Sequence, residues 1–180
     1  MKYFNYESVN STNDKAKQLC QHSPKLLESG CVVTADHQEN GRGTKGRVWE
    51  SSCTGGLYYS IAFKPTTFDF QSIETYHLDI AATIQRVVAK QTTIQLDIKA
   101  PNDLYLNGKK VGGILMESVT TAGTNHELQY LIIGIGLNIG QSSFPSHLND
   151  IATSLAIETN RSIDKHQLIV PISDALRAIF

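Results

Sequence analysis

Apolar residues along the chain form short runs that predict a sheet of several strands. We expect strands at Tyr3–Tyr6, Cys31–Ala35, Gly56–Phe63, Ile94–Ile98, Leu104–Leu106, Lys110–Ser118 and Leu128–Leu137. The pair Asn107-Gly108 lies between two of these runs and is typical of a tight hairpin turn. A turn-like segment at 120–125 leads into the last strand. The pattern therefore predicts a strand-rich chain that contains at least one hairpin.

Apolar residues also recur every three to four positions, which predicts helices. The longest such pattern covers residues 72–90. The segment 11–14, Ser-Thr-Asn-Asp, predicts a helix start with a hydroxyl cap and an acid three residues on. Two more helices are expected, at Ser154–Glu158 and Asp164–Phe180, and Pro171 is expected to interrupt the second because it lacks an N–H donor. The order of elements indicates a mixed α and β fold without repeats.

Composition indicates one globular domain and disfavours several classes of protein. The chain has 180 residues, of which 41% are hydrophobic and 18% are charged, as in ordinary globular proteins. Its formal net charge of −1 gives no global basic field, so we do not expect DNA as a partner. No apolar run approaches the length of about 18 residues that spans a membrane, and the N-terminus lacks the apolar core of a signal peptide. We therefore expect no membrane attachment and a cytoplasmic location.

The spacing of cysteines and histidines indicates neither a disulfide framework nor a zinc site. Cys20, Cys31 and Cys53 are odd in number and show no CxxC spacing, so we expect free thiols in a reducing compartment. The six histidines are scattered along the chain, without the paired spacing of tight metal sites.

The segment Gly41–Trp49, GRGTKGRVW, here called the basic loop, combines three glycines, three cations and the single tryptophan of the chain. Glycine costs backbone entropy in a helix or a strand, so this composition favours a loop. Backbone N–H groups can approach oxygens, the cations can neutralise an anion, and the Trp49 indole offers a face to a flat ring. The basic loop therefore predicts a phosphate site. We expect it to be mobile without ligand, because its cations repel one another and lack partners.

Other interpretations of the basic loop are weaker. Gly41, Gly43 and Gly46 match the GxGxxG of dinucleotide-binding folds, but loop composition follows where that fold needs a helix. The same glycines with Lys64 imitate a protein kinase, yet no HRD or DFG follows and 180 residues cannot hold both kinase lobes. A solvated basic loop without a ligand stays open.

A second cluster of candidate residues follows near the predicted hairpin. The proline in the segment 99–103, KAPND, fixes a turn that aims Asn102 and Asp103 at a common point. Lys110 stands beside paired glycines at 112–113, which indicates close approach of another group to the strand backbone. The alternative is a solvated lysine with a bulge at the glycines.

A third cluster, GIGLNIG at 134–140, ends a strand in glycines and the amide of Asn138, which alone is typical of a turn. Taken in order, GRGTKGRVW, KAPNDLYLNGKKVGGILMES and IIGIGLNIG resemble the catalytic domain of biotin protein ligases, also called biotin–[acetyl-CoA-carboxylase] ligases. The resemblance runs from Ser11 to about Asn138. It implies an α+β fold, a mixed β-sheet flanked by helices, similar to the catalytic core of class II aminoacyl-tRNA synthetases.

The resemblance implies a reaction in two steps. ATP with Mg²⁺ first converts the biotin carboxylate to biotinyl-5′-AMP and releases pyrophosphate. A specific lysine of a biotin carboxyl carrier protein, such as the carrier domain of acetyl-CoA carboxylase, then attacks this mixed anhydride. Biotin, ATP and the carrier are thus the expected partners, and a homodimer is compatible with the family.

The same resemblance assigns roles to residues of the three clusters. The residues expected around biotin are Ser11, Thr12, Asn13 and Gln38. The basic-loop residues expected over biotin and the adenylate are Gly41, Arg42, Gly43 and Thr44. Those expected at the ATP side are Arg47, Trp49, Asn138 and the phosphate-binding set Lys99, Asn102 and Asp103, with Asp103 as the Mg²⁺ ligand. Lys110, near Gly113, is expected to bind the biotin carboxylate and later the acyl-phosphate oxygen. The candidate catalytic residues are Lys110, Arg42 and Lys99.

Some of these residues also have a purely structural interpretation, and two positions differ from the family pattern. A helix cap would be enough to explain Ser11 or Thr12, and ordinary core packing would be enough to explain Trp49. Ala100 replaces the usual tryptophan of the KWPND motif, and Thr44 stands where many members carry an arginine.

Domain organisation and two other functions follow from the same reading. We expect one catalytic domain over 1–180, without a preceding DNA-binding domain and without a small C-terminal β-domain. Two other functions stay open: a lipoate or octanoate ligase or transferase of the same fold, and a non-catalytic protein that binds biotin or a nucleotide.

Overall fold

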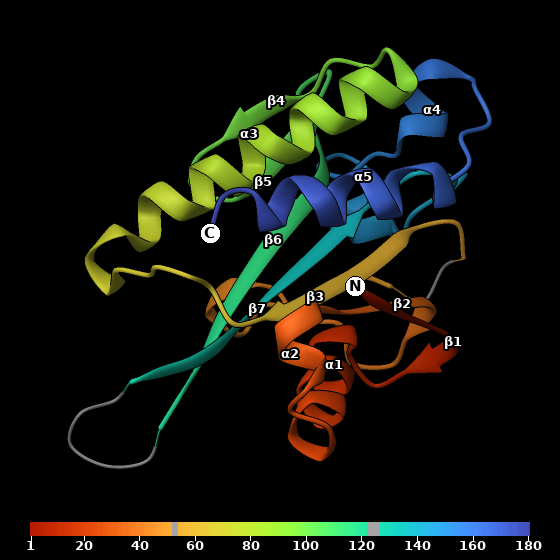
Figure 1. Cartoon of the computed structure of the whole chain (residues 1–180). Coiled ribbons are helices and arrows are strands. Elements are labelled where there is room, and N and C mark those ends of the chain that lie inside the picture. The colour runs from red at the N-terminus through yellow and green to blue at the C-terminus, as the bar shows by residue number, and fades with distance from the viewer. Residues whose placement is uncertain (52–53, 122–126) are drawn as a thin grey trace.

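The computed structural model describes residues 1–51, 54–121 and 127–180. Its strands form one seven-stranded sheet in the order β1-β2-β3-β7-β6-β5-β4 (Figure 1). Their bounds are β1 Lys2–Val9, β2 Cys31–Gln38, β3 Leu57–Phe63, β4 Asp97–Lys99, β5 Asp103–Leu106, β6 Lys109–Thr120 and β7 Leu128–Leu137. β1 pairs with β2 in parallel, and the other neighbouring strands pair antiparallel. The sheet is therefore mixed, as the predicted α+β class requires.

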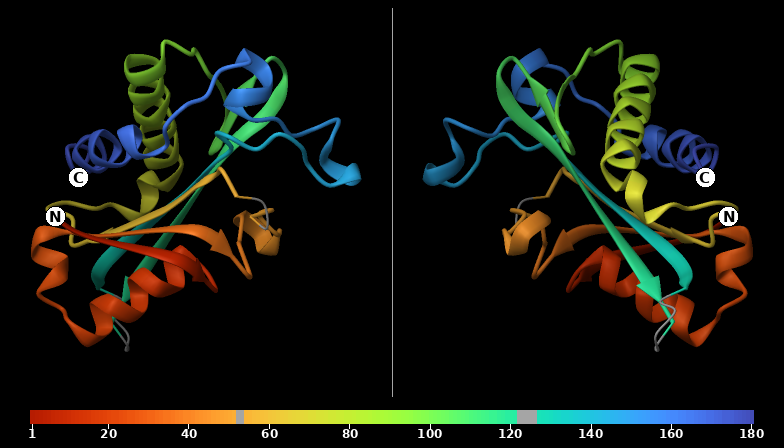
Figure 2. Two further views of the ribbon diagram at one scale, coloured as in Figure 1. Left: turned by 90° about the vertical axis from the view of Figure 1, so that its right-hand side faces the viewer. Right: turned by 90° about the vertical axis from the view of Figure 1, so that its left-hand side faces the viewer.

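Helices cover both faces of this sheet and give three layers. α1 Thr12–His22 and α2 Leu26–Ser29 lie on one face, and α3 Ile73–Thr92 and α5 His166–Arg177 lie on the other (Figure 2). The short helix α4 spans Leu155–Thr159, and single 3₁₀ turns occur at Thr44–Gly46, Phe70–Ser72 and Ser146–Leu148. α3 and α5 also contact each other, so together they form one continuous apolar layer.

The alternation of side chains along β7 makes the two faces of the sheet different. Ile133, Ile135 and Leu137 belong to the main hydrophobic core, which α3 and α5 complete. The positions between them are Gly134 and Gly136, which face the opposite side because strand side chains alternate. One face is thus packed against helices, while the other leaves backbone accessible to polar side chains.

A smaller core lies under α1 on this second face. Ala16 and Cys20 of α1 contact buried residues of the sheet, among them Cys31, Val33 and Ile132. Both of these cysteines are free and buried, as predicted. Cys53 lies outside the described residues. The small core anchors α1, so the residues at its N-terminal end have fixed positions over the glycines of β7.

The structure confirms most of the predicted elements. Each predicted strand overlaps an observed strand, and Leu128–Leu137 has the predicted bounds. Asn107 and Gly108 join β5 to β6 with φ of 51° and 80°, the left-handed geometry that tight hairpin turns need. The turn predicted at 120–125 falls mainly on residues outside the described parts of the chain.

Two helix details are wrong. Ser11 occupies the N-cap position of α1, but its side chain makes no capping hydrogen bond, and Asp14 pairs with Arg42 instead. α5 also continues through Pro171. Burial of Leu168 and other residues of that helix in the main core offsets the lost backbone hydrogen bond.

Several strand bounds differ from the predicted ones, and the largest difference at the start of a strand is in the segment 94–98. The strand predicted at Ile94–Ile98 begins only at Asp97. Ile94 and Leu96 are buried in the main core. Their apolar side chains pack there from the segment that connects α3 to β4, and they are not part of a paired strand. Burial and strand alternation produce the same sequence pattern at this point.

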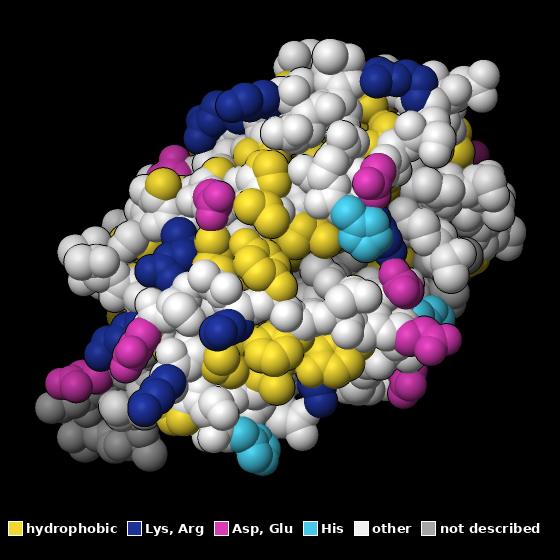
Figure 3. Space-filling model, turned by 45° about the vertical axis from the view of Figure 1, so that its right-hand side comes forward, with side chains coloured by type: hydrophobic (Ala, Val, Ile, Leu, Met, Phe, Trp, Pro, Cys, Tyr) yellow, Lys and Arg dark blue, Asp and Glu magenta, His cyan; other side chains and the backbone are white. Residues whose placement is uncertain are grey.

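The exterior carries charges of both signs. Lys and Arg side chains are interspersed with Asp and Glu on the face in Figure 3, in keeping with the net charge of −1. In the described parts of the chain, no helix has both the length and the apolar character needed to cross a bilayer.

We predict that Leu168→Ala lowers the free energy of unfolding by about 2–5 kcal/mol, because this fully buried leucine joins α5 to the main core. Val170→Ala, at a half-exposed position of the same helix, is the control and should change it by less than about 0.5 kcal/mol. Urea unfolding measures both values. A small effect in both variants would contradict the placement of α5 on the sheet.

Candidate active site

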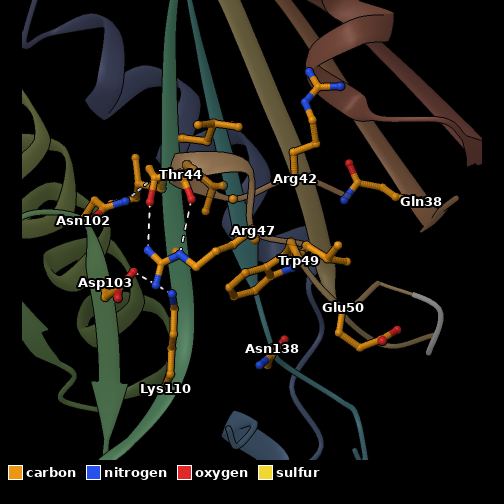
Figure 4. Close-up of a pocket in the computed structure, with 18 of the residues that line it drawn as sticks. Gln38, Arg42, Thr44, Arg47, Trp49, Glu50, Asn102, Asp103, Lys110 and Asn138 are labelled. Atoms are coloured by element: carbon orange, nitrogen blue, oxygen red, sulfur yellow. Dashed lines mark hydrogen bonds and ion pairs between the residues drawn. The ribbon is translucent and has the colours of Figure 1, made fainter. Parts of the chain in front are cut away.

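A cavity of about 230 Å³ lies on the glycine face of the sheet beneath the basic loop (Figure 4). The start of α1, the end of β2, the β5–β6 hairpin, β7 and the segment 144–152 contribute to its lining. The predicted site residues that line it are Ser11, Thr12, Asn13, Gln38, Arg42, Gly43, Thr44, Arg47, Trp49, Asn102, Asp103, Lys110, Gly113 and Asn138. The fold thus brings the three sequence clusters together at one place.

The floor of the cavity is a chain of hydrogen bonds between polar side chains, all of them buried except that of Glu117. Thr12 donates its N–H and its hydroxyl to Gln38 Oε1, at 2.9 and 3.1 Å. Ser60 Oγ lies 2.8 Å from Thr12 Oγ1 and 2.5 Å from Asn13 Oδ1. Asn13 donates its amide to Glu117 Oε2 at 2.5 Å. The floor therefore presents donors and acceptors whose orientations are already fixed.

The basic loop folds as a small hairpin over this floor. Gly43 N–H donates to Arg47 O at 2.7 Å, and Trp49 N–H donates to Gly41 O at 2.9 Å. The chain reverses at Thr44–Gly46 and then continues as a loop. Because no helix opens at the third glycine, the dinucleotide-binding interpretation is wrong.

Trp49 packs on the backbone of the sheet and forms one wall of the cavity. A Cβ atom on Gly113 would lie 3.0 Å from the indole, and one on Gly136 would overlap indole atoms. Lys110 Nζ lies 5.4 Å from the ring centroid, within cation–π range. The buried Nε1 has no hydrogen-bond partner among the described residues. Trp49 is absent from both hydrophobic cores, so it belongs to the site and not to core packing.

Contacts on both the backbone and the side chain hold Lys110 at the cavity. Its N–H donates to Ile151 O at 2.8 Å, and its carbonyl accepts from Thr153 N–H at 2.9 Å. Its Nζ forms a 2.7 Å ion pair with Asp103 Oδ1, with the two side chains 25% and 19% exposed. Lys110 is thus a fixed cation and not a solvated lysine.

Two buried asparagines brace the walls. Asn102 Nδ2 donates to Ile114 O at 2.8 Å, and Asn138 Nδ2 donates to Thr153 O at 3.0 Å. The first bond ties the KAPND turn to β6, and the second ties the end of β7 to the segment that holds Lys110. Both residues therefore have a structural role in addition to lining the cavity.

The structure does not bring two of the predicted site residues into the cavity lining. Lys99 is exposed, and its Nζ lies 5.1 Å from the centroid of the Tyr105 ring. Gly41 is buried at the base of the basic loop, where a Cβ atom would lie 2.5 Å from Ser51 Oγ and from Trp49 O. Gly41 thus shapes the hairpin from behind.

Two polar side chains of the hydrogen-bonded floor escaped prediction. Ser60 stands inside an apolar run and Glu117 lies within β6, so only strand alternation places them on the glycine face of the sheet, behind the residues that line the cavity. Asn13 lies so close to Gly134 that a Cβ atom there would overlap its side chain. The opposite wall is apolar and carries no motif; its residues are Phe144, Leu148, Ile151 and Ala152.

Arg42 lies between two carboxylates. Its guanidinium forms a bidentate pair with Asp14, at 2.5 and 2.7 Å, and approaches Glu117 Oε1 to 3.6 Å. The hydrogen bonds between the two side chains hold the pKa of Asp14 below its ordinary value and raise the pKa of Arg42. The expectation that the cations of the basic loop lack partners is therefore wrong for Arg42. Mobility of the loop without ligand stays a prediction.

The donors at the cavity are compatible with a metal ion that arrives with a nucleotide. Mg²⁺ in nucleotide sites takes one or two carboxylates together with phosphate oxygens and water. Asp103 lines the cavity and offers one carboxylate. Within the described residues, no group of three or more His, Cys, Asp or Glu is arranged to hold an ion, so phosphates and water must supply most of its ligands.

Comparison with known proteins places this arrangement among ligases. Residues 6–138 match the family model described as the biotin/lipoate A/B protein ligase family. A bifunctional ligase/repressor BirA of Bacillus spizizenii is 36% identical over 165 residues, which are 89% of this chain and 48% of that protein. The chain thus spans about half the length of the curated relatives it matches first.

Two solved structures share the fold of nearly the whole chain. The biotin protein ligase of Aquifex aeolicus, in complex with biotin and ATP, has a TM-score of 0.79 at 28% identity and covers 99% of this chain and 71% of its own. The Leishmania major biotin protein ligase, in complex with biotinyl-5-AMP, has a TM-score of 0.78 at 26% identity and covers 99% and 74%. These likenesses confirm the predicted ligase-like fold.

We predict that Gly136→Ala displaces the indole of Trp49, because the new methyl group would overlap it. Trp49 is the only tryptophan, so its fluorescence reports the change as a red-shifted emission and stronger quenching by acrylamide. Gly140→Ala is the control, since a Cβ atom there meets nothing nearer than 3.5 Å. The same emission in both variants would contradict the packing of Trp49 on β7.

Proposed function

Because this chain belongs to the biotin/lipoate A/B protein ligase family, we propose that it activates biotin with ATP and transfers the biotinyl group to a lysine of a carrier protein. The first step forms biotinyl-5′-AMP and releases pyrophosphate, and the second forms an amide and releases AMP. The observation that carries the proposal is the fixed cation Lys110 at a cavity with a polar floor and the basic loop above it. The ligands of the two solved ligases, biotin with ATP and biotinyl-5-AMP, support the same chemistry.

The polar floor is proposed to bind the ureido ring of biotin. That ring presents one carbonyl acceptor and two N–H donors, and the floor offers both kinds of partner. The proposed contacts are Ser11, Thr12, Asn13 and Gln38. Hydrogen bonds within the floor fix Thr12, Asn13 and Gln38 before the ligand arrives, which lowers the entropy lost on binding.

Lys110 is proposed to act at the reacting centre. A biotin carboxylate oxygen attacks the α-phosphorus of ATP, and the bond to the bridging oxygen breaks as pyrophosphate leaves. Two anions have to meet in this step, so a cation held at a fixed point lowers the barrier by positioning and charge neutralisation. The ion pair with Asp103 orients the ammonium group.

The remaining cations and amides are proposed to face the nucleotide. Arg47 donates to Thr44 Oγ1 at 3.0 Å, and Figure 4 shows its guanidinium directed toward Asp103 and Lys110. Asp103 is proposed to hold Mg²⁺, which supplies positive charge at the phosphates. The other proposed nucleotide contacts are Gly43, Thr44, Trp49, Asn102, Gly113 and Asn138. Lys99 can join them only by leaving its contact with Tyr105.

The acceptor is proposed to be a lysine of biotin carboxyl carrier protein. Its neutral amine attacks the carbonyl carbon of the adenylate, AMP departs with the bonding electrons, and the amine proton is released. Residues 1–180 are proposed to act as a single catalytic domain in the cytoplasm, without a DNA or membrane partner and with a homodimer allowed. The net charge of −1 and the mixture of charges on the face in Figure 3 support the absence of a DNA partner.

Transfer of lipoate or octanoate is the second candidate, since the family description covers lipoate ligases as well. The floor favours biotin, because neither the linear chain of octanoate nor the dithiolane ring of lipoate carries N–H or carbonyl groups to pair with its buried donors and acceptors. A protein that binds biotin without reacting is the third candidate.

We predict that the purified chain releases pyrophosphate from ATP–Mg²⁺ only when biotin is present. Lys110→Ala should lower this rate by about a hundredfold or more, as for the loss of one preorganised charge-stabilising group. Lys90→Ala, on α3 at the opposite face of the sheet, is the matched control and should keep the wild-type rate.

The other outcomes separate the candidates. Release that depends on lipoate or octanoate instead of biotin would favour the second candidate. Binding of biotin by calorimetry without any pyrophosphate release would favour the third. Equal rates in the Lys110 and Lys90 variants would remove Lys110 from the reacting centre.

A further inference from the structure

The most extensive polar contacts of the basic loop are made by Arg42 at the edge of the cavity. In Figure 4 its guanidinium is directed away from Lys110 and toward α1. Its two guanidinium nitrogens bind both oxygens of Asp14, at 2.5 and 2.7 Å. A third contact, 3.6 Å long, joins it to Glu117 on β6. One side chain of the loop is thus attached to two different elements of the rigid fold.

We propose that Asp14 and Glu117 are positioning residues that hold the basic loop closed over the cavity through Arg42. The inference rests on the proposed function, because the loop then closes over biotin and its adenylate. In this arrangement Arg42 is itself a positioning residue, and the cations that meet the phosphates are Arg47 and Lys110. Planar bidentate pairing of Arg with a carboxylate fixes direction as well as distance, which a closing loop requires.

Charge balance supports this division of roles. Arg42 already lies against two carboxylates, so a phosphate that approached it would have to compete with both. Both partners also shift its titration in one direction, since Asp14 and Glu117 each raise the pKa of Arg42. Arg47, in contrast, has only neutral oxygens of Thr44 as hydrogen-bond partners among the residues that the structure describes. Its charge is therefore better placed to meet an anion.

Glu117 connects loop closure to the cavity floor. One of its oxygens approaches Arg42, and the other accepts from Asn13 at 2.5 Å. Asn13 continues the chain to Ser60 and Thr12. A ring that binds at the floor therefore meets side chains which also orient the partner of Arg42. The same carboxylate serves both ligand recognition and closure.

Two sets of contacts hold the loop, one on each strand of its hairpin. Arg42 on the first strand forms ion pairs, whereas Trp49 on the second strand packs against Gly113 and Gly136. The ion pairs are partly exposed, with Arg42 and Asp14 side chains 39% and 42% accessible. Salt should therefore weaken the ion pairs of Arg42 and leave the packing of Trp49 largely unchanged.

Hydrogen exchange in the ligand-free protein tests the proposal without requiring catalysis, because the contacts of Arg42 set the fraction of time for which the mobile loop is closed. The reporters are the amides of Gly43 and Trp49, which are hydrogen-bonded inside the hairpin. Asp14→Asn should lower their protection about fivefold, the upper range for one partly exposed ion pair. Asp14→Glu should restore protection, and Asp79→Asn on exposed α3 is the charge-matched control.

A double-mutant comparison then identifies the partner. If Asp14 acts through Arg42, Asp14→Asn combined with Arg42→Gln should lower protection no further than Arg42→Gln alone. In wild type, 1 M NaCl should reproduce much of the loss, and it should have little effect in Asp14→Asn. Glu117→Gln should reduce the extra protection that biotin gives to the same amides.

Either of two results would overturn the inference. Unchanged loop protection in Asp14→Asn, with lower protection in Arg42→Gln, would show that Arg42 acts through another group. Additive losses in the double variant would show that the two residues act separately. Because exchange is measured before any reaction, such a result would not bear on the proposed ligase activity, which the pyrophosphate assay tests separately.

Discussion

The missing Cβ atoms of Gly113, Gly134 and Gly136 allow the site to form on the face of a sheet. Gly113 and Gly136 are paired neighbours on β6 and β7, and the indole of Trp49 occupies the space above them. Gly134 leaves the corresponding space for the side chain of Asn13. A methyl group at Gly134 or Gly136 would overlap a site residue, and one at Gly113 would lie in tight contact with the indole. Close approach to backbone, and not turn geometry, is the reason for glycine at these positions.

Because of these glycines, one face of the central strands packs the hydrophobic core and the other face carries the polar groups of the site. On β7 the isoleucines that alternate with the glycines fill the core under α3 and α5, so the strand is held firmly from one side. The other side can then carry buried polar groups, provided that each has a partner. The chain from Gln38 through Thr12, Ser60 and Asn13 to Glu117 supplies those partners. Rigidity of the apolar face therefore permits a preorganised polar floor.

Much of this arrangement could be predicted from local sequence. Strands, helix α3 and the Asn107-Gly108 hairpin follow from periodicity and turn preference, and Trp49, Lys110 and Asp103 stand in recognisable clusters. Ser60 and Glu117 could not be found in this way, because their role depends on which face of a strand they occupy and on what lies across it. The Asp14–Arg42 pair joins residues 28 positions apart, which a local motif does not reveal. Asp14 instead suggested a helix cap, since a cap and an ion pair use the same carboxylate.

The exposed position of Lys99 has a similar explanation. Its sequence neighbours Asn102 and Asp103 enter the cavity, but Lys99 precedes the turn and belongs to β4 at the edge of the sheet. Membership of a motif therefore did not ensure membership of the cavity. The fold determines which residues of a motif line the cavity, whereas the motif indicates only which residues are candidates.

A structure of the protein with bound biotin would test the central claim most directly. We expect the ureido ring to lie within hydrogen-bond distance of Thr12, Asn13 or Gln38. The carboxylate should be directed to Lys110, and Arg42 should still be paired with Asp14. A carboxylate bound to Arg42, with the Asp14 pair broken, would contradict the division of roles between the two cations. A ring bound away from the polar floor would contradict the assignment of the site itself.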